Sequence, residues 1–148
     1  MHESIDIWVD GSTYGNPGPS GIGILMKYKG SIKEIKEYIG VATIHTTELK
    51  AIERSLDLVK DKSIPINIFS DSKYAVYVLT ERWTAHNNTY LIDNLKNKMH
   101  GFNNISFIKV LAHSGITENE RVDQLAKEAV REQLVKEGKR DWLEPLMK

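Results

Sequence analysis

The stretch that most constrains this chain is residues 5–12, with the sequence IDIWVDGS. Its apolar residues alternate with Asp6, Trp8 and Asp10 at the period of two that is typical of a β-strand. The pattern stops at an Asp-Gly pair, which leaves Asp10 at the carboxyl end of the strand. Asp-Gly is also a frequent hairpin turn, so Asp10 alone could be a turn residue. We expect instead that the fold brings three later carboxylates to it: Glu48, Asp71 and Asp123.

The length of 148 residues is typical of a single domain with a proper core. The chain contains no cysteine, so any metal would be bound by oxygen or imidazole. The 20 basic and 20 acidic residues balance, which argues against non-specific coating of nucleic acid but permits a local basic face. Because no membrane span or signal-peptide pattern is present, we expect a cytoplasmic protein. We also expect a monomer without an obligate protein partner.

The remaining patterns predict further strands and helices in a definite order. Strands are expected at 20–28, 31–41, 66–69 and 105–111, and helices at 46–60, 71–83, 88–99 and 117–137. This order predicts an α/β fold with a five-stranded mixed sheet, three antiparallel strands followed by parallel ones, flanked by about four helices. A capping box is expected at Thr117. The core spans about 5–137, and the tail 138–148 either packs back on the domain or extends from it.

Two of the three later carboxylates lie at element boundaries. Asp71 follows the apolar strand 66–69 and precedes a helix, so it could simply be an N-cap. Glu48 lies in the first turn of its helix, where the dipole favours a carboxylate. However, Glu48 shares its helix face with the apolar residues Ile52 and Leu56, and a solvated capping residue has no reason to face the core.

Asp123 shows the same unusual placement, because Ala126 and Val130 lie on its side of the last helix. A buried carboxylate is costly unless it is paired or binds a metal. Four such groups could balance much of the charge of two Mg²⁺ ions about 3.5–4 Å apart, the arrangement used for in-line displacement at phosphate. His113, in a turn before this helix, is either a surface residue or a proton shuttle beside such a site.

Several short motifs, taken in chain order, carry a resemblance. They are Asp-Gly-Ser at 10–12, Asn-Pro-Gly-Pro at 16–19 with Gly21, Thr-Glu-Leu at 47–49, Ser-Asp-Ser-Lys-Tyr at 70–74, His-Ser-Gly at 113–115, and Asn-Glu-Arg at 119–121 with Asp123. Together they resemble ribonuclease H type 1 from about residue 5 to residue 129. That family has the five-stranded mixed sheet reached above from the element order.

The resemblance implies an endonuclease that cuts the RNA strand of RNA–DNA hybrids and leaves 5′-phosphate and 3′-hydroxyl ends. It implies two Mg²⁺ ions, with Mn²⁺ as a substitute, bound by Asp10, Glu48, Asp71 and Asp123. His113 matches the histidine that assists proton transfer and product release. All five are therefore expected catalytic residues.

The resemblance also implies the substrate-binding residues Gly11, Ser12, Asn16, Thr43, Ser72 and Trp83. Gly11, Ser12 and Asn16 match positions that touch RNA 2′-hydroxyls, the groups that distinguish RNA from DNA. Thr43 matches a threonine that holds a DNA phosphate. Trp83 matches an aromatic residue of the DNA-strand groove, although it could instead be a core residue at a helix end.

The sequence departs from the family pattern in three places. Ile44-His45 replaces a pair of asparagines, and Ala112 replaces a glycine. A basic helix present in many bacterial members is missing, since residues 81–88 contain a single arginine. Its loss predicts weaker binding and a shallower salt dependence. The lysines of strands two and three either form a substitute basic face or are simply solvated; they are Lys27, Lys29, Lys33 and Lys36.

Two alternative functions follow from the same features. A DNA nuclease of the same fold is disfavoured because Asn16 and the Asp10-Gly11-Ser12 segment suit recognition of 2′-hydroxyls. A non-catalytic hybrid-binding module is disfavoured because all four carboxylates and His113 are present, and loss of one ligand should abolish metal-pair chemistry. The sequence therefore favours an active hybrid-specific endonuclease.

Overall fold

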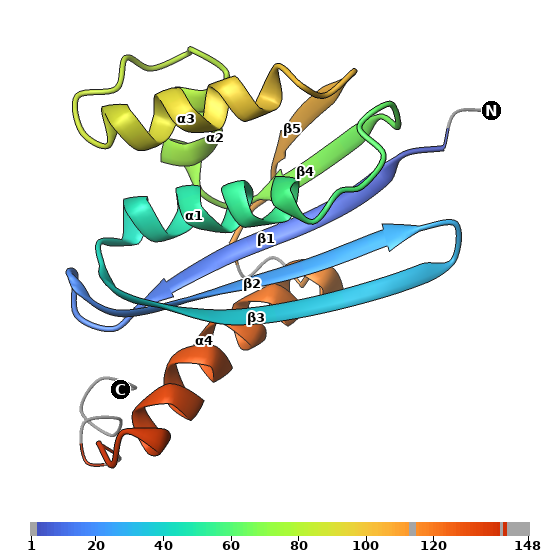
Figure 1. The fold of residues 1–148 in the computed structure, drawn as a ribbon. Coiled ribbons are helices and arrows are strands. Elements are labelled where there is room, and N and C mark those ends of the chain that lie inside the picture. The colour runs from blue at the N-terminus through green and yellow to red at the C-terminus, as the bar shows by residue number, and fades with distance from the viewer. Residues whose placement is uncertain (1–2, 113–114, 140, 142–148) are drawn as a thin grey trace.

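A mixed five-stranded sheet forms the centre of the described structure (Figure 1). The computed structural model describes residues 3–112, 115–139 and 141. Within them lie β1 (Ile5–Thr13), β2 (Gly18–Tyr28), β3 (Ser31–Ala42), α1 (Ile44–Asp57), β4 (Ile66–Ser70), α2 (Lys73–Leu79), α3 (Thr89–Met99), β5 (Ile105–Lys109) and α4 (Thr117–Lys136). This is the predicted order of elements. None of these helices is long and apolar enough to cross a membrane.

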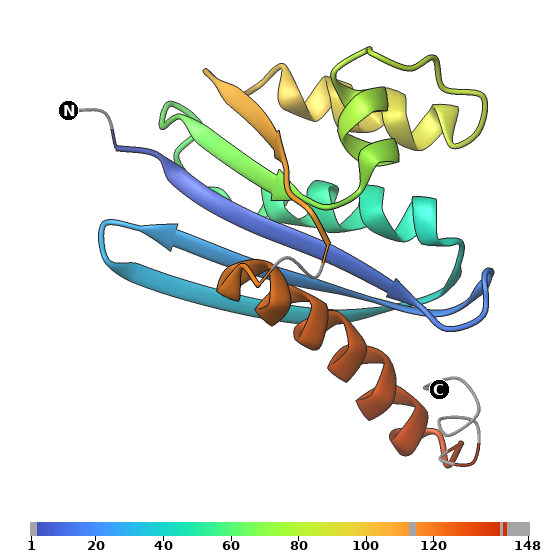
Figure 2. The same ribbon diagram turned by 180° about the vertical axis from the view of Figure 1, so that it is seen from behind.

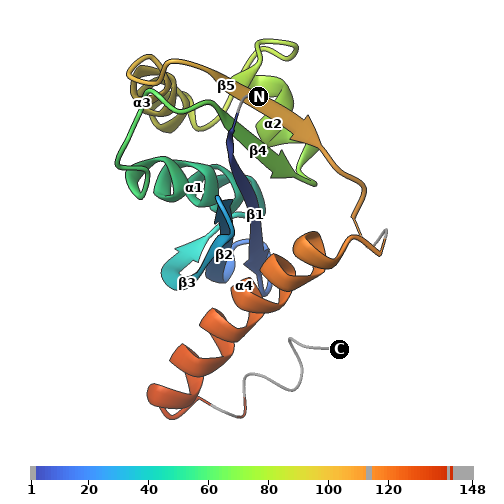
Figure 3. The ribbon, with the colours of Figure 1, turned by 90° about the vertical axis from the view of Figure 1, so that its right-hand side faces the viewer.

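The strand order in the sheet is β3-β2-β1-β4-β5. β1 and β3 pair antiparallel with β2, whereas β4 pairs parallel with both β1 and β5. The predicted mixed sheet is thus confirmed. Helices α1, α2 and α3 pack on one face of the sheet, and α4 crosses the other face, as Figures 1–3 show together.

The main core lies between the sheet and the layer formed by α1, α2 and α3. Ile7 of β1, Leu49 of α1, Ile68 of β4 and Leu95 of α3 have no exposed surface. Burying each such side chain contributes about 1.5–3 kcal/mol relative to leaving it in water. In β1 the residues at positions 5, 7 and 9 are all buried, which confirms the period-two pattern of the opening stretch.

Two glycines of β2 determine how closely α4 approaches the sheet. A Cβ atom built on Gly23 would lie 2.2 Å from the backbone oxygen of Val122, and one built on Gly21 would lie 2.5 Å from that of Ala126. No side chain fits at either place, so the helix backbone rests directly on the strand backbone. Gly23 is the register partner of Asp10. The start of α4 is therefore held beside the carboxyl end of β1.

Some element boundaries differ from the prediction. Helix α1 begins at Ile44 rather than 46, because the Thr43 hydroxyl accepts a hydrogen bond from Thr46 N at 3.2 Å. Helix α2 covers only Lys73–Leu79 instead of 71–83, because Ser72 is its N-cap and accepts from Ala75 N at 3.1 Å. Ser72, and not Asp71, is therefore the N-cap of this helix.

The start of α4 corrects another prediction. Its N-cap is Ile116, which makes no side-chain cap hydrogen bond, so the predicted capping box with Thr117 as the cap is wrong. Ile116 takes the cap position, so Thr117 is the first residue inside the helix and its hydroxyl cannot act as the cap. The helix ends before Gly138, which has the positive φ of 70° that favours glycine. Most of the tail 138–148, for which the sequence left two arrangements open, lies outside the described residues.

Candidate active site

Asp10 and Glu48 are brought together by the contact between β1 and α1. A Cβ atom on Gly11 would lie 2.8 Å from the Thr47 methyl group and 3.2 Å from Glu48 N. The missing side chain lets the first turn of α1 pack on the end of β1. As a result both carboxylates are buried, with Asp10 4% and Glu48 6% exposed. The Gly11 N–H donates to Asp10 Oδ1 at 2.9 Å.

Asp71 reaches the same place through the parallel pairing of β1 and β4. Trp8 is the register partner of Phe69, so the residues two positions further on, Asp10 and Asp71, leave the sheet at the same edge. One oxygen from each of Asp10, Glu48 and Asp71 lies within 4.8 Å of the others. The structure thus brings together three of the four carboxylates that the sequence predicted would converge.

Asp123 lies outside this three-oxygen group but close to it. Its charge raises the pKa of the Asp10 carboxyl, which places it within electrostatic range. The Asp123 side chain keeps 28% of its surface exposed and forms an ion pair with Lys127 at 3.0 Å. α4 therefore presents the fourth carboxylate at the margin of the cluster, where the lysine partly balances its charge.

The electrostatics of the cluster favour binding of a cation. Burial raises the pKa of Asp10 well above its ordinary value, and the charges of Asp71 and Asp123 raise it further, against a lowering by the Gly11 N–H. Burial likewise raises the pKa of Glu48, with added contributions from Asp10 and Asp71. Among the described residues, Glu48 Oε2 is buried without a hydrogen-bond partner. An oxygen-only donor set with an unpartnered buried oxygen fits Mg²⁺ or Mn²⁺.

A pocket of about 500 Å³ contains Glu48 and Asp71 and extends along the start of α2. Its other lining residues are Ile44, His45, Ser72, Lys73, Tyr74, Trp83 and Ala112. Trp83 is 44% exposed, so it belongs to the pocket wall and not to the core. Ser72 and Trp83, both predicted to bind substrate, therefore lie beside the carboxylates. His113, the predicted proton shuttle, lies outside the described residues.

The other predicted substrate residues lie at the ends of β1 and β3. Gly11 and Ser12 are buried. Asn16 and Thr43 are exposed but also make local contacts that the sequence did not predict. Asn16 Oδ1 accepts a hydrogen bond from Ile44 N at 2.9 Å, and Thr43 caps α1. Both residues thus support the helix that carries Glu48, a role visible only once the β1–β2 turn and α1 are seen side by side.

His45, which departs from the family pattern together with Ile44, takes part in contacts between three helices. The His45 ring stacks on Tyr74 with the ring centres 4.0 Å apart and the planes 3° apart. Asn88 Nδ2 donates to the Tyr74 hydroxyl at 3.3 Å, and the Thr46 hydroxyl donates to Asn88 Oδ1 at 2.8 Å. These contacts join the starts of α1, α2 and α3. The signal in the sequence was the Asn-Asn pair before α3, since asparagine tolerates the positive φ of 58° at Asn88.

The lysines of β2 and β3 are mostly engaged with acidic residues. Lys27, Lys29 and Lys36 form ion pairs at 2.7, 3.2 and 2.7 Å, respectively. Their partners are Glu118, Glu3 and Glu132. The structure therefore favours an ion-paired, solvated strand face over a substitute basic face at these positions.

A sheet of this order, with carboxylates clustered where the neighbouring strands β1 and β4 end and α1 begins, defines the class of enzymes with a ribonuclease H-like fold. The chain belongs to the ribonuclease H family, because the RNase H family model matches residues 2–131. Ribonuclease H of Chlorobium phaeobacteroides is 33% identical over 147 residues, covering 88% of this chain and 98% of that protein. The resemblance stated from the motifs is confirmed.

Two solved structures agree in fold. RNase H1 from the halophilic archaeon Halobacterium salinarum NRC-1 gives a TM-score of 0.74 at 28% identity, covering 87% of this chain and 98% of that one. LC11-RNase H1, solved in complex with an RNA/DNA hybrid, gives a TM-score of 0.77 at 25% identity, covering 88% of this chain and 99% of that one. Homologues named as ribonucleases H and these structural neighbours identify the protein as an enzyme of this family.

Proposed function

We propose that this protein hydrolyses the RNA strand of RNA–DNA hybrids as a two-metal-ion endonuclease, leaving 5′-phosphate and 3′-hydroxyl ends. The observation that carries the proposal is the meeting of Asp10, Glu48 and Asp71 within 4.8 Å, with one buried oxygen unpartnered among the described residues. Family membership and the hybrid complex of LC11-RNase H1 support the hybrid as substrate. The catalytic domain covers 1–148, with its core at 5–137, and acts as a cytoplasmic monomer.

The carboxylates are the proposed metal ligands. Asp10, Glu48, Asp71 and Asp123 would hold two Mg²⁺ ions, with Mn²⁺ as a substitute. When bound, two such cations supply charge stabilisation for in-line displacement at phosphorus. Asp10 and Glu48 are fixed by backbone packing around Gly11, so the chain prepares this donor set before any cation or substrate binds. His113 carries the proton transfer that accompanies displacement and product release.

The pocket walls would orient the substrate. Gly11, Ser12 and Asn16, at the end of β1 and in the following turn, would meet the 2′-hydroxyls of an RNA strand, which is how a protein distinguishes RNA from DNA. Ser72 and Trp83 line the pocket beside Asp71 and would contact the backbone of the duplex. Thr43, exposed at the start of α1, would bind a phosphate of the DNA strand.

The test is cleavage of an end-labelled RNA–DNA hybrid with Mg²⁺, compared with the same sequence as duplex DNA and duplex RNA. We expect only the RNA strand of the hybrid to be cut, and Asp10→Asn to abolish the cut. Asp93→Asn, an exposed residue of α3, is the matched control and should cleave like the parent. Cleavage of duplex DNA would favour a DNA nuclease. Hybrid binding without cleavage, in Mg²⁺ or Mn²⁺, would favour a binding module.

A further inference from the structure

Some of the described cations are held by carboxylates and others are not. Lys27 and Lys36, which point from the sheet toward α4, are held by carboxylates, and so is Lys127 beside Asp123. Lys73 and Arg82 are among the described cations that form no ion pair with another described residue. Both are exposed, and both lie over aromatic rings instead.

These two cations share one aromatic support. Lys73 Nζ lies 5.6 Å from the ring centre of Tyr77 and 5.6 Å from that of Trp83. The Arg82 guanidinium carbon lies 4.2 Å from the Tyr77 ring centre. The two rings meet edge to face, with centres 5.1 Å apart and planes 88° apart. Cation–π contacts of this kind hold a cation in place without neutralising its charge.

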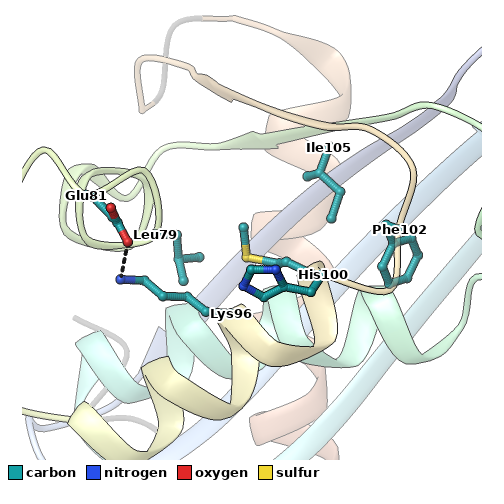
Figure 4. A pocket seen from close by; sticks show the side chains of 7 residues that line it. Leu79, Glu81, Lys96, His100, Phe102 and Ile105 are labelled. Carbon is teal, nitrogen blue, oxygen red and sulfur yellow. Dashed lines mark hydrogen bonds and ion pairs between the residues drawn. The ribbon is translucent and has the colours of Figure 1, made fainter.

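The backbone after α2 fixes this arrangement. Tyr77 O accepts hydrogen bonds from Arg82 N at 2.8 Å and from Trp83 N at 3.1 Å. Between them and the helix, Glu81 has a positive φ of 61°. Its carboxylate pairs with Lys96 of α3 at 3.3 Å, at the rim of a separate pocket of about 370 Å³ (Figure 4). The acidic residue next to Arg82 is therefore turned away and engaged elsewhere.

The cluster adjoins the candidate active site. Lys73 and Trp83 line the same pocket as Glu48 and Asp71, and Tyr77 lies one helical turn beyond Lys73. Cations placed beside a carboxylate cluster, yet not paired with it, offer a counter-charge to backbone phosphates that extend away from the cleavage point.

We infer that Lys73 and Arg82, supported by Tyr77 and Trp83, form a phosphate-binding surface for the RNA–DNA hybrid. It takes over the role of the basic helix that the chain lacks, since residues 81–88 contain a single arginine. The inference rests on the proposed function for the identity of the duplex. Whether or not the protein cleaves the hybrid, Lys73 and Arg82 should contribute to the salt dependence of hybrid binding, and the ion-paired cations should not.

The experiment measures binding of a fluorescent RNA–DNA hybrid by the full chain across a series of NaCl concentrations. The protein carries Asp10→Asn and the buffer contains EDTA, so neither cleavage nor divalent ions interfere. Each phosphate contact contributes about 0.9 to the slope of log K against log[salt] for duplex DNA. We expect Lys73→Gln with Arg82→Gln to reduce the slope by about 1.8 and to weaken binding about tenfold or more near 0.1 M salt.

The matched control removes two other positive charges. Lys29 pairs with Glu3 at 3.2 Å, and Lys98 pairs with Asp57 at 2.9 Å. Lys29→Gln with Lys98→Gln changes the net charge equally and should leave the slope within about 0.5 of the parent value. An unchanged slope in the Lys73/Arg82 variant, or the same decrease in both double variants, would overturn the inference.

Variants of the ring test the support itself. Tyr77→Phe keeps the ring and should bind like the parent, whereas Tyr77→Leu keeps both charges but removes the surface on which they rest. We expect Tyr77→Leu to weaken binding about threefold to tenfold with most of the salt slope retained. Equal binding by the two variants would show that the ring has no such role. Thermal melting checks that each variant is folded.

Failure of the proposed function gives a different result from failure of this inference. If the unaltered protein cuts no hybrid in Mg²⁺ or Mn²⁺, the proposed activity is wrong, yet the salt titration still measures the contribution of Lys73 and Arg82 to binding. If the protein cuts the hybrid but the Lys73/Arg82 variant keeps the full slope, the activity stands and the inference is wrong.

Discussion

The buried and the peripheral carboxylates of the cluster are held differently. Asp10 at the end of β1 and Glu48 at the start of α1 are buried, and the contact between these two elements depends on Gly11. Asp123, on α4, keeps part of its surface exposed and is paired with Lys127. The pKa values of the two buried carboxyl groups are raised, whereas the charge of the peripheral Asp123 is partly balanced by Lys127. The same cluster thus contains two carboxylates whose burial opposes ionisation and one carboxylate that remains partly exposed to water.

The largest expected effect is on catalysis. Asp10→Asn and Glu48→Gln should each reduce hybrid cleavage by about 10³-fold or more, because they remove fixed donors to cations that supply much of the transition-state stabilisation. Asp123→Asn should reduce it by a smaller factor, with partial recovery at high Mn²⁺. Single-turnover rates at saturating metal measure the difference. Equal losses in all three variants would mean that the buried and peripheral carboxylates are equivalent.

A second comparison concerns proton transfer. His113→Ala should slow turnover by about 10²-fold while leaving cleavage measurable, because general acid–base help is the smaller contribution beside the cations. Its pH–rate profile should lose one limb that the parent shows. The control variant His86→Ala, on the exposed loop before α3, should retain the parent's cleavage rate and pH–rate profile. A His113→Ala protein with no cleavage at all would assign this residue a role beyond proton transfer.

The placement of α4 can be disturbed without touching a carboxylate. Gly23→Ala inserts a methyl group where the Val122 oxygen lies 2.2 Å from the Cβ position. We expect a loss of about 1–3 kcal/mol in the free energy of unfolding, together with lower activity, since Asp123 moves with the helix. Gly30→Ala is a useful comparison, because no atom lies within 4 Å of its Cβ position and only its positive φ opposes the change. Urea titration and cleavage assays give both readouts.

The stability of the metal-free protein should depend on pH in the direction set by the buried pair. The pKa values of Asp10 and Glu48 are raised in the folded state, so the folded protein retains protons that the unfolded chain has lost. In EDTA, stability should therefore fall as pH rises above about 4, the ordinary range of these groups. Glu48→Gln should flatten this dependence, and Mg²⁺ should restore stability more at pH 8 than at pH 5. Calorimetry in EDTA and in Mg²⁺ tests all three expectations.

The smallest expected effect is at the stacked pair beside the pocket. Tyr74→Phe removes the hydroxyl that accepts from Asn88 but keeps the ring under His45. Because the hydrogen bond is long and partly exposed, the loss should be about 0.5–1 kcal/mol with little change in cleavage rate. Tyr74→Ala, which removes the stack as well, should raise the KM for the hybrid by a larger factor than it lowers kcat. Thermal unfolding and steady-state kinetics separate the two contributions.

Much of this architecture could be predicted from the sequence. The period of two in β1, the apolar stripe behind Glu48 and the position of Asp71 after a buried strand were sufficient for the sheet and for three converging carboxylates. These features are reliable predictors because a buried face of a strand or helix requires apolar residues at regular spacing in the sequence. The capping box at Thr117 failed because the helix begins one residue earlier than the motif implies, with Ile116 at the cap position and Thr117 already inside the helix.

The contacts that the sequence did not predict connect segments far apart in the chain. Asn16 meets Ile44, and Tyr74 meets both His45 and Asn88, through pairings that have no periodicity. Lys73 and Arg82 likewise converge on Tyr77 only because the chain turns sharply after α2. Such polar and aromatic contacts follow from how the ends of helices meet, which local patterns do not record.

The direct contact of α4 with Gly21 and Gly23 has a consequence for how the chain tolerates change. Because the helix backbone rests on the strand beneath it, the position of Asp123 relative to Asp10 depends on the absence of side chains at these two glycines. A larger residue at either position would lift the helix from the strand and carry Asp123 with it. Two residues that take no part in chemistry therefore determine whether the fourth carboxylate can reach the other three.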